Sequence, residues 1–240
     1  MERLGLNSVA PFDPGKKIIE YRVAEPPDEP LAAMSLRGFI EEVAARSSAP
    51  GGGSVSAVLA ALGAGLGAMV AKLTYGVRRF EAVDHRMRAV IPTLHALTRE
   101  LIAMIDADTS AFNEYMEGVR MPRGTPEEKA ARTARMQEGL KTAVWVPLAT
   151  MRIGDRAWEA LRETARWGNP ASRSDVQVGA RSLEAGIWGA FQNVLINLEG
   201  IRDEAFRTET EAEAAALTDR ARKQLAEVLE ILEARRKGRP

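Results

Sequence analysis

The sequence predicts an all-α fold, a multi-helix up-and-down bundle with a short extended arm at its N-terminus. Alanine, leucine, glutamate and arginine are abundant while aromatic residues make up only 5% of the 240-residue chain, a composition that favours helices. From about residue 35 onward, apolar residues recur with the helical period and are separated by short turns. Hydrophobic residues make up 45% of the chain, which is sufficient for a core.

Composition also excludes several classes of function. The 33 basic residues balance the 33 acidic ones, which argues against nucleic acid or an anionic membrane as an obligate partner. The chain has no cysteine, so disulfides and thiolate metal sites are excluded, and its two histidines do not suggest a histidine-rich metal centre. The N-terminus lacks an apolar signal core, and we therefore expect a cytoplasmic protein.

Residues 1–34 differ from the remainder and are predicted to form an extended arm, with residues 35–240 forming the helical domain. Ile18–Val23 lies in the only convincing short strand, and Glu25–Pro30 has the composition of an extended linker. Because a helical chain offers no sheet for this strand, we expect it to lie on the surface, pair with another copy or dock on a partner.

The helical domain divides at recognisable start and stop residues. Ser35 is a candidate cap for a helix with apolar residues at i, i+3, i+4, i+7 and i+8. A stretch from about Arg79 to Gly118 is predicted to break or kink near Pro92. The helix before the last is predicted to end near Gly200. The last helix is predicted to run from about Asp203 to Arg236.

Thr125, Pro126 and Glu128 predict a capping box that opens a further helix. This helix is predicted to run toward Trp167, with a disturbance at Pro147. The proline either frees backbone groups for a ligand or merely bends the helix around the core.

The most unusual stretch is Pro50–Ser54, which contains three consecutive glycines. The glycines give the backbone access to positive φ and to close approach, and Ser54 is a candidate N-cap for the small-residue helix that follows. Such a helix start can bind an anion or polar ligand. The alternatives are a transmembrane span, a flexible linker and a purely structural close-packed helix.

Asp108 is the first candidate catalytic residue. Ala111 and Phe112 follow at i+3 and i+4, so the carboxyl group shares a face with apolar residues, whereas Asp106 lies about 200° around the helix. A carboxyl group on such a face should have a raised pKa and can carry a proton near neutral pH. The alternative is a solvated or ion-paired aspartate at a helix edge.

The segment from Gly168 to Asp175 is the second candidate, because Asn169, Arg173 and Asp175 crowd around a helix start. Simple capping and ion pairing explain these residues equally well. Lys72 is the only charge in the small-residue helix, and it either extends to the surface or faces an anionic ligand.

Several short segments occur in a fixed order and spacing. They are Ser47–Ser54, Met69–Thr74, Asp108–Phe112, Pro122–Lys129, Val146–Leu148, Gly168–Val178 and Phe191–Leu198. Together they resemble the cyclodeaminase domain of formiminotransferase-cyclodeaminase, over about residues 35 to 236. Leu4 to Val23 also resembles the end of the preceding transferase domain. The body of that domain has no counterpart here, so transferase activity is not expected.

The resemblance implies an all-α bundle that forms a homodimer, with a folate site between subunits. The implied reaction converts 5-formiminotetrahydrofolate to 5,10-methenyltetrahydrofolate and ammonia without a metal or cofactor. Asp108 matches the proposed proton donor of the family. The residues expected to orient the substrate are Gly51, Gly52, Gly53, Ser54, Lys72, Asn169, Arg173 and Asp175.

The expected partners are a tetrahydrofolate derivative, with or without a polyglutamate tail, and a separately encoded formiminotransferase bound through residues 1–34. Two alternative functions remain open. One is methenyltetrahydrofolate cyclohydrolase activity within the same family. The other is a non-catalytic helical subunit that docks on a transferase.

Overall fold

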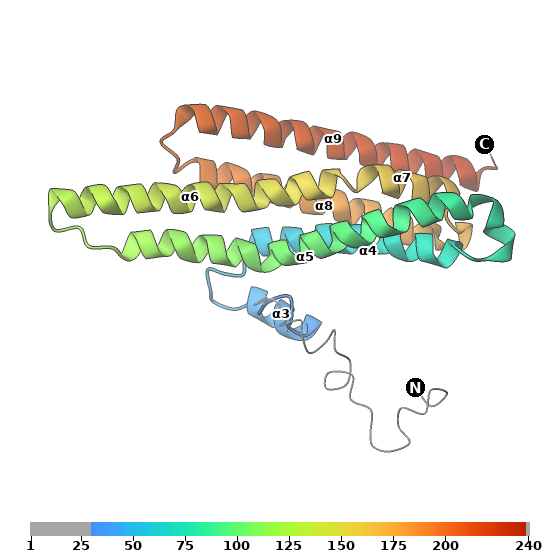
Figure 1. Ribbon diagram of the computed structural model, residues 1–240, viewed down its shortest axis with the longest axis horizontal. Coiled ribbons are helices and arrows are strands. Elements are labelled where there is room, and N and C mark those ends of the chain that lie inside the picture. The colour runs from blue at the N-terminus through green and yellow to red at the C-terminus, as the bar shows by residue number, and fades with distance from the viewer. Residues whose placement is uncertain (1–29, 239–240) are drawn as a thin grey trace, which may run out of the picture.

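The computed structural model describes residues 30–238 and confirms the all-α bundle; the described part of the chain holds no strand. Six helices pack along one axis, with a further helix, α3, outside the bundle (Figure 1). Their bounds are α3 Leu36–Val43, α4 Gly52–Thr74, α5 Asp84–Arg120, α6 Pro126–Asp155, α7 Trp158–Trp167, α8 Arg173–Leu198 and α9 Glu204–Arg236. Two short 3₁₀ helices, η2 Arg78–Val83 and η3 Pro170–Ser172, precede α5 and α8.

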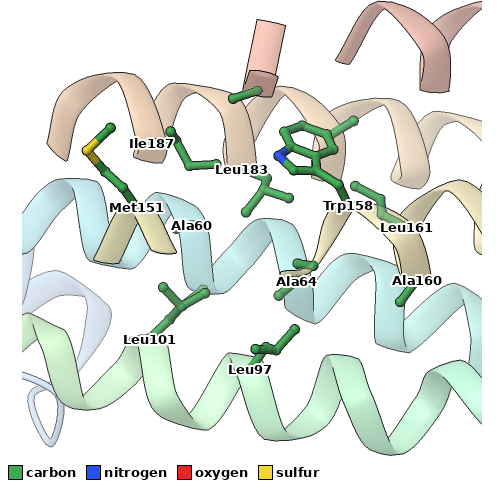
Figure 2. Packing of buried hydrophobic residues seen from close by; sticks show 14 of the residues in the cluster. Ala60, Ala64, Leu97, Leu101, Met151, Trp158, Ala160, Leu161, Leu183 and Ile187 are labelled. Atoms are coloured by element: carbon green, nitrogen blue, oxygen red, sulfur yellow. The ribbon is translucent and has the colours of Figure 1, made fainter. Parts of the chain in front are cut away.

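Helix α4 lies at the centre of the bundle and packs mainly against α5 and α8. Its small side chains meet larger ones from the surrounding helices, so that Ala60 and Ala64 lie opposite Leu97 and Leu101 of α5 (Figure 2). The same core contains Met151, Trp158, Leu161, Leu183 and Ile187. A helix made of small residues therefore allows its neighbours to share one continuous core.

Glycines bring the backbones of α4 and α8 into direct contact. A Cβ atom added at Gly63 would lie 2.7 Å from the carbonyl oxygen of Gly179 and the backbone nitrogen of Leu183. A Cβ atom added at Gly186 would lie 2.6 Å from the backbone nitrogen of Ala60. Real Cβ atoms do not approach backbone atoms this closely, so these glycines fix the spacing of the two helices.

By length and composition α4 could cross a membrane, but 61% of its most apolar window is buried within the protein. Most of this window therefore belongs to the core of the bundle, as the close-packed alternative from the sequence predicted.

The predicted caps at Ser35 and Thr125 are confirmed, and the structure adds a cap at Asp203. Thr125 accepts a hydrogen bond from the Glu128 nitrogen at 3.2 Å, and the Glu128 side chain accepts from the Thr125 nitrogen at 3.1 Å, which confirms the capping box. Asp203 caps α9 through the nitrogen of Phe206 at 3.1 Å. Ser35 caps α3 through the nitrogen of Gly38.

Neither internal proline breaks its helix, so the break considered near Pro92 is wrong, while a kink at either proline stays a prediction. Helix α5 runs through Pro92, whose side chain is exposed, and α6 runs through Pro147 as far as Asp155. Proline at position 147 has no N–H for the carbonyl of Ala143 one turn earlier. The side-chain nitrogen of Asn197 donates to that carbonyl instead, at 2.7 Å, so the helix continues.

The segment before α3 is anchored to the bundle by Asp106. The buried carboxylate accepts hydrogen bonds from the backbone nitrogens of Leu31 at 2.7 Å and Ala32 at 3.0 Å. Leu31 packs beside Ala57 and Ile105, so this contact spans α4 and α5. Asp106 therefore holds the end of the predicted arm against the bundle.

Helix α3 has the predicted apolar stripe, but of this stripe only Phe39 packs against a buried cluster, that of Leu31, Ala57 and Ile105. None of its residues is buried, and Leu36 and Ile40 are 74% and 57% exposed. The strand predicted at Ile18–Val23 lies outside the described residues, and its docking role stays a prediction.

Two glycines in α4 offer a matched test of the close packing. Gly63→Ala should destabilise the protein by about 1–3 kcal/mol, because the added methyl group meets the backbone of α8. Gly65→Ala should stabilise it by up to about 1 kcal/mol, because only Thr98 lies near the added carbon, at 3.9 Å, and alanine favours helix. Urea unfolding of both variants measures the difference. Equal stabilities would contradict the proposed role of Gly63.

Candidate active site

The Gly-rich segment begins α4 earlier than predicted. Gly51 is the N-cap and the helix starts at Gly52, so Ser54 lies in the first turn and is not the N-cap. The Ser54 side chain is fully buried and donates to the carbonyl of Ile105 in α5 at 2.8 Å. Ser54 therefore ties the first turn of α4 to α5.

The glycines of this segment are needed for close approach and not for positive φ, which corrects the sequence interpretation. The described glycines with positive φ are Gly76 and Gly238. A Cβ atom at Gly53 would overlap the carboxylate of Asp108. At this position only glycine allows the carboxylate of α5 to rest on the first turn of α4.

Asp108 is held there by Ser54. Its Oδ2 atom accepts from the backbone nitrogen of Ser54 at 3.0 Å, and the Ser54 hydroxyl lies 3.3 Å from the same oxygen. Burial raises the pKa of the Asp108 carboxyl above its ordinary value, and the two contacts with Ser54 only partly offset this effect. Asp108 forms no ion pair with any residue among 30–238, so the ion-paired part of the alternative, a solvated or ion-paired aspartate at a helix edge, is wrong.

A cleft of about 200 Å³ opens beside Asp108. It lies where the start of α4 meets α5, α6 and α8, and the loop after α3 forms one side. The lining residues are Ser48, Ala49, Gly51, Gly52, Asp108, Phe112, Ala143, Asn193 and Asn197. Phe112 accompanies Asp108 as the i, i+4 spacing predicted.

Sequence reasoning did not identify Asn193 and Asn197 as site residues. They lie four residues apart on one face of α8, a spacing that brings two side chains together. The signal in the sequence is indirect: Pro147 leaves the carbonyl of Ala143 on α6 without its helical donor, and Asn197 donates to that carbonyl.

The remaining predicted site residues lie at the opposite end of the bundle. Lys72 is exposed near the end of α4, twenty residues from Gly52, which corresponds to about 30 Å along a helix. Asn169 and Arg173 lie beside the same end of α4, since the Asn169 nitrogen donates to Thr74 Oγ1 at 2.8 Å. One chain therefore does not bring all predicted site residues together.

This opposite end has its own cavity of about 400 Å³, which Asn169 and Arg173 line together with Arg235. Arg235 donates to the carbonyls of Ala165 at 2.6 Å and Gly168 at 2.9 Å, so its guanidinium satisfies the end of α7. Burial lowers the pKa of Arg235. Asp175 lies in the first turn of α8 but does not line the cavity.

Asn169 is held within the backbone turn that precedes α8. Its side-chain oxygen accepts from the nitrogen of Ala171 at 3.1 Å and from Arg79 at 3.3 Å. Part of its role is therefore capping, as the structural alternative from the sequence predicted.

The cleft beside Asp108 has the arrangement expected for acid catalysis on a nitrogen compound. Among residues 30–238, Asp108 is the only charged residue that lines the cleft, and Asn193, Asn197 and Ser48 add neutral polar groups. The ring of Phe112 supplies an apolar surface. A carboxyl group whose pKa is raised can donate a proton to a bound base and then stabilise a cation beside it.

The chain is similar to known proteins of one family. The profile of the family described as Formiminotransferase-cyclodeaminase matches residues 35–216. Formimidoyltransferase-cyclodeaminase of Mus musculus is 48% identical over 237 residues, which cover 98% of this chain and 44% of that protein. The methenyltetrahydrofolate cyclohydrolase of Methylorubrum extorquens is 37% identical over 193 residues, 78% of this chain and 93% of that protein.

A solved structure is also similar. Formiminotetrahydrofolate cyclodeaminase from Thermotoga maritima superposes with a TM-score of 0.74 and 28% identity, covering 84% of this chain and 97% of that one. The chain spans less than half the length of the mouse relative, 44%. The extent of the profile match and the high identity to curated relatives show that this chain belongs to the formiminotransferase-cyclodeaminase family.

Proposed function

We propose that the protein is a formimidoyltetrahydrofolate cyclodeaminase, an ammonia lyase of one-carbon folate metabolism and histidine degradation. The observation that carries the proposal is the placement of Asp108 on Gly53, beside a cleft in which it is the only charged lining residue of the part of the chain that the structure describes. The relatives are named as enzymes that act on folates, either cyclodeaminases or a cyclohydrolase.

The proposed reaction begins with protonated Asp108 and the neutral formimino group on N5 of the folate. N10 attacks the formimino carbon and forms a new C–N bond, while Asp108 donates a proton to the imine nitrogen. The proton of N10 returns to the Asp108 carboxylate and is then passed to the amine. The C–N bond to this amine breaks, ammonia leaves, and the methenyl cation remains beside the ionised Asp108.

The environment of Asp108 suits both roles. Burial keeps the carboxyl group protonated to higher pH than usual, so the acid is available at the start of the reaction. The contacts from Ser54 stabilise the carboxylate once the proton has left. The free N–H groups in the first turn of α4 can orient polar groups of the pterin.

The separation of the two predicted clusters supports a site built from two subunits. Within one chain, Asp108 and the group that contains Lys72, Asn169 and Arg173 lie at opposite ends of α4. A second copy that packs antiparallel along α4 would place its opposite end beside the Asp108 cleft.

Helix α4 carries an apolar seam suited to this pairing. Apolar residues recur with alternating spacings of four and three along its outer face, a pattern typical of paired helices. They are Val55, Leu59, Leu62, Leu66, Met69 and Leu73. Leu62, Met69 and Leu73 are 55%, 37% and 50% exposed, so the seam is available to a second subunit.

Methenyltetrahydrofolate cyclohydrolase activity is the second candidate, favoured by the relative of that name at 37% identity. One assay separates the two: purified protein is mixed with 5-formiminotetrahydrofolate, and methenyl absorbance and ammonia are followed together. Matched release of both supports the cyclodeaminase. Hydrolysis of methenyltetrahydrofolate without ammonia release from the formimino compound would overturn it.

Asp108→Asn should leave the fold intact and lower turnover by about 10²–10⁴-fold, because the amide keeps the shape but loses the transferable proton. The measurement is kcat for ammonia release, with circular dichroism as a control for folding. A loss smaller than about tenfold would show that Asp108 is not the acid.

The pH dependence of activity and stability follows from the raised pKa of Asp108. Deamination should fall as pH rises through this pKa, because the acid form of Asp108 is lost.

The native state binds the Asp108 proton more tightly than the unfolded state does. The stabilisation that this proton gives the native state is therefore complete below the pKa of Asp108 in the unfolded state, and it is lost as pH rises through the pKa in the folded state. The melting temperature of Asp108→Asn minus that of the wild-type protein should therefore increase as pH rises. A constant difference would contradict the burial of the carboxyl group.

Hybrid dimers test the shared site. Asp108→Asn and Arg173→Ala should each be impaired alone, while a reassociated mixture should recover about a quarter of wild-type activity, because half the dimers are hybrids with one intact site. No recovery, with hybrid formation shown by mass spectrometry of differently tagged subunits, would place both residues in one subunit's site. Full activity of Arg173→Ala alone would exclude it from the site.

A further inference from the structure

Two amides in the cleft have no part in the proton transfer assigned to Asp108. Asn193 and Asn197 follow one another at one helical turn on α8, and both line the cleft. The side-chain nitrogen of each donates a hydrogen bond to a backbone carbonyl. No described residue donates to the side-chain oxygen of either asparagine. Both oxygens therefore remain available to a ligand.

The orientation of Asn197 is set by a gap in the hydrogen bonding of α6. Pro147 cannot donate to the carbonyl of Ala143, and Asn197 Nδ2 occupies that acceptor at 2.7 Å. A carbonyl oxygen only accepts hydrogen bonds, so the nitrogen of the amide must face it. The Oδ1 atom of Asn197 is therefore not bonded to Ala143, and both residues line the cleft.

The orientation of Asn193 is fixed in the same way. Its Nδ2 atom donates to the carbonyl of Gly189 at 2.8 Å. Its amide lies against the start of α4, since a Cβ atom at Gly52 would be 3.2 Å from Nδ2 and 3.7 Å from Oδ1. Gly52 thus leaves room for the amide at the mouth of the cleft.

We propose that the Oδ1 atoms of Asn197 and Asn193 accept hydrogen bonds from the nitrogen of the formimino group, and that these contacts select a nitrogen leaving group over an oxygen one. The inference rests on the proposed function and assigns its specificity to these two residues. Asn197 and Asn193 bind the nitrogen, Asp108 supplies the proton, and Pro147 is a positioning residue for Asn197.

The selection follows from hydrogen-bonding chemistry. The formimino nitrogen carries an N–H at the start and gains further N–H bonds as it is protonated, so two fixed acceptors bind it more strongly as the reaction proceeds. A carbonyl oxygen at the same place has no hydrogen to donate and would face two acceptors. The loss of one hydrogen bond to a group that becomes charged corresponds to roughly a ten- to hundredfold change.

The test removes the acceptor of Asn197 without leaving a backbone carbonyl unsatisfied. In the double variant Pro147→Ala/Asn197→Leu, the N–H of the new alanine can donate to Ala143 in place of the missing amide. Asn193→Leu is a second variant, because the Gly189 carbonyl already has its helical partner. Asn113→Leu is the matched control, since Asn113 is an exposed asparagine on α5 that does not line the cleft.

Two quantities are measured for each variant: kcat/KM for ammonia release from 5-formiminotetrahydrofolate, and Kd for 5,10-methenyltetrahydrofolate, which has no nitrogen to release at the bridging carbon. The double variant and Asn193→Leu should each lose about tenfold or more in kcat/KM, with Kd within twofold of wild type. Asn113→Leu should change neither. Pro147→Ala alone should lower kcat/KM while the melting temperature is unchanged or raised.

Equal losses in kcat/KM and in affinity for the methenyl compound would show that the amides only shape the cleft, and would overturn the inference. Unchanged kcat/KM in the double variant and in Asn193→Leu would also overturn it while leaving the proposed function standing. Failure of the wild-type protein to release ammonia would overturn both, because no formimino nitrogen would then be held.

Discussion

The contact between the first turn of α4 and the carboxylate of Asp108 is the constraint on which the candidate site depends. Glycine is the only residue type that leaves space for the carboxylate at position 53. Ser54 contacts the same carboxylate through both its backbone nitrogen and its hydroxyl group. The same two residues bring α4 and α5 together at the mouth of the cleft. The proposed acid is thus built into the packing of two helices, not carried on a loop.

Glycines also allow close contacts farther along α4, where the partner is the backbone of α8. Gly63 and Gly186 bring α4 and α8 into backbone contact, which fixes where α8 lies relative to α5. Asn193 and Asn197 lie on that same α8, beyond Gly186, so the spacing of the two backbones determines how far these amides reach into the cleft. Packing in the core therefore positions polar groups at the site, which explains why small residues are concentrated in one central helix.

The sequence was sufficient to predict features that depend on neighbouring residues. The capping box at Thr125, the cap at Ser35 and the shared face of Asp108 and Phe112 follow from spacings of three or four residues. It did not show why the glycines are needed, because the atom that requires Gly53 belongs to Asp108, fifty-five residues later. The orientation of Asn197 likewise depends on a missing N–H in another helix. The exposed apolar face of α3 has a helical period that cannot distinguish a core from an intermolecular surface.

The position of Lys72, Asn169 and Arg173 illustrates a further limit of sequence reasoning. The family resemblance implies a site between subunits, but the order of residues does not show that about 30 Å of α4 separates Lys72 from the Gly-rich segment within one chain. A central helix with candidate site residues at both ends can build a single site only if a second copy runs in the opposite direction. An antiparallel pair about a two-fold axis meets this condition twice, once at each end of the seam from Val55 to Leu73. In the proposed dimer, the length of α4 therefore sets the distance between two equivalent sites.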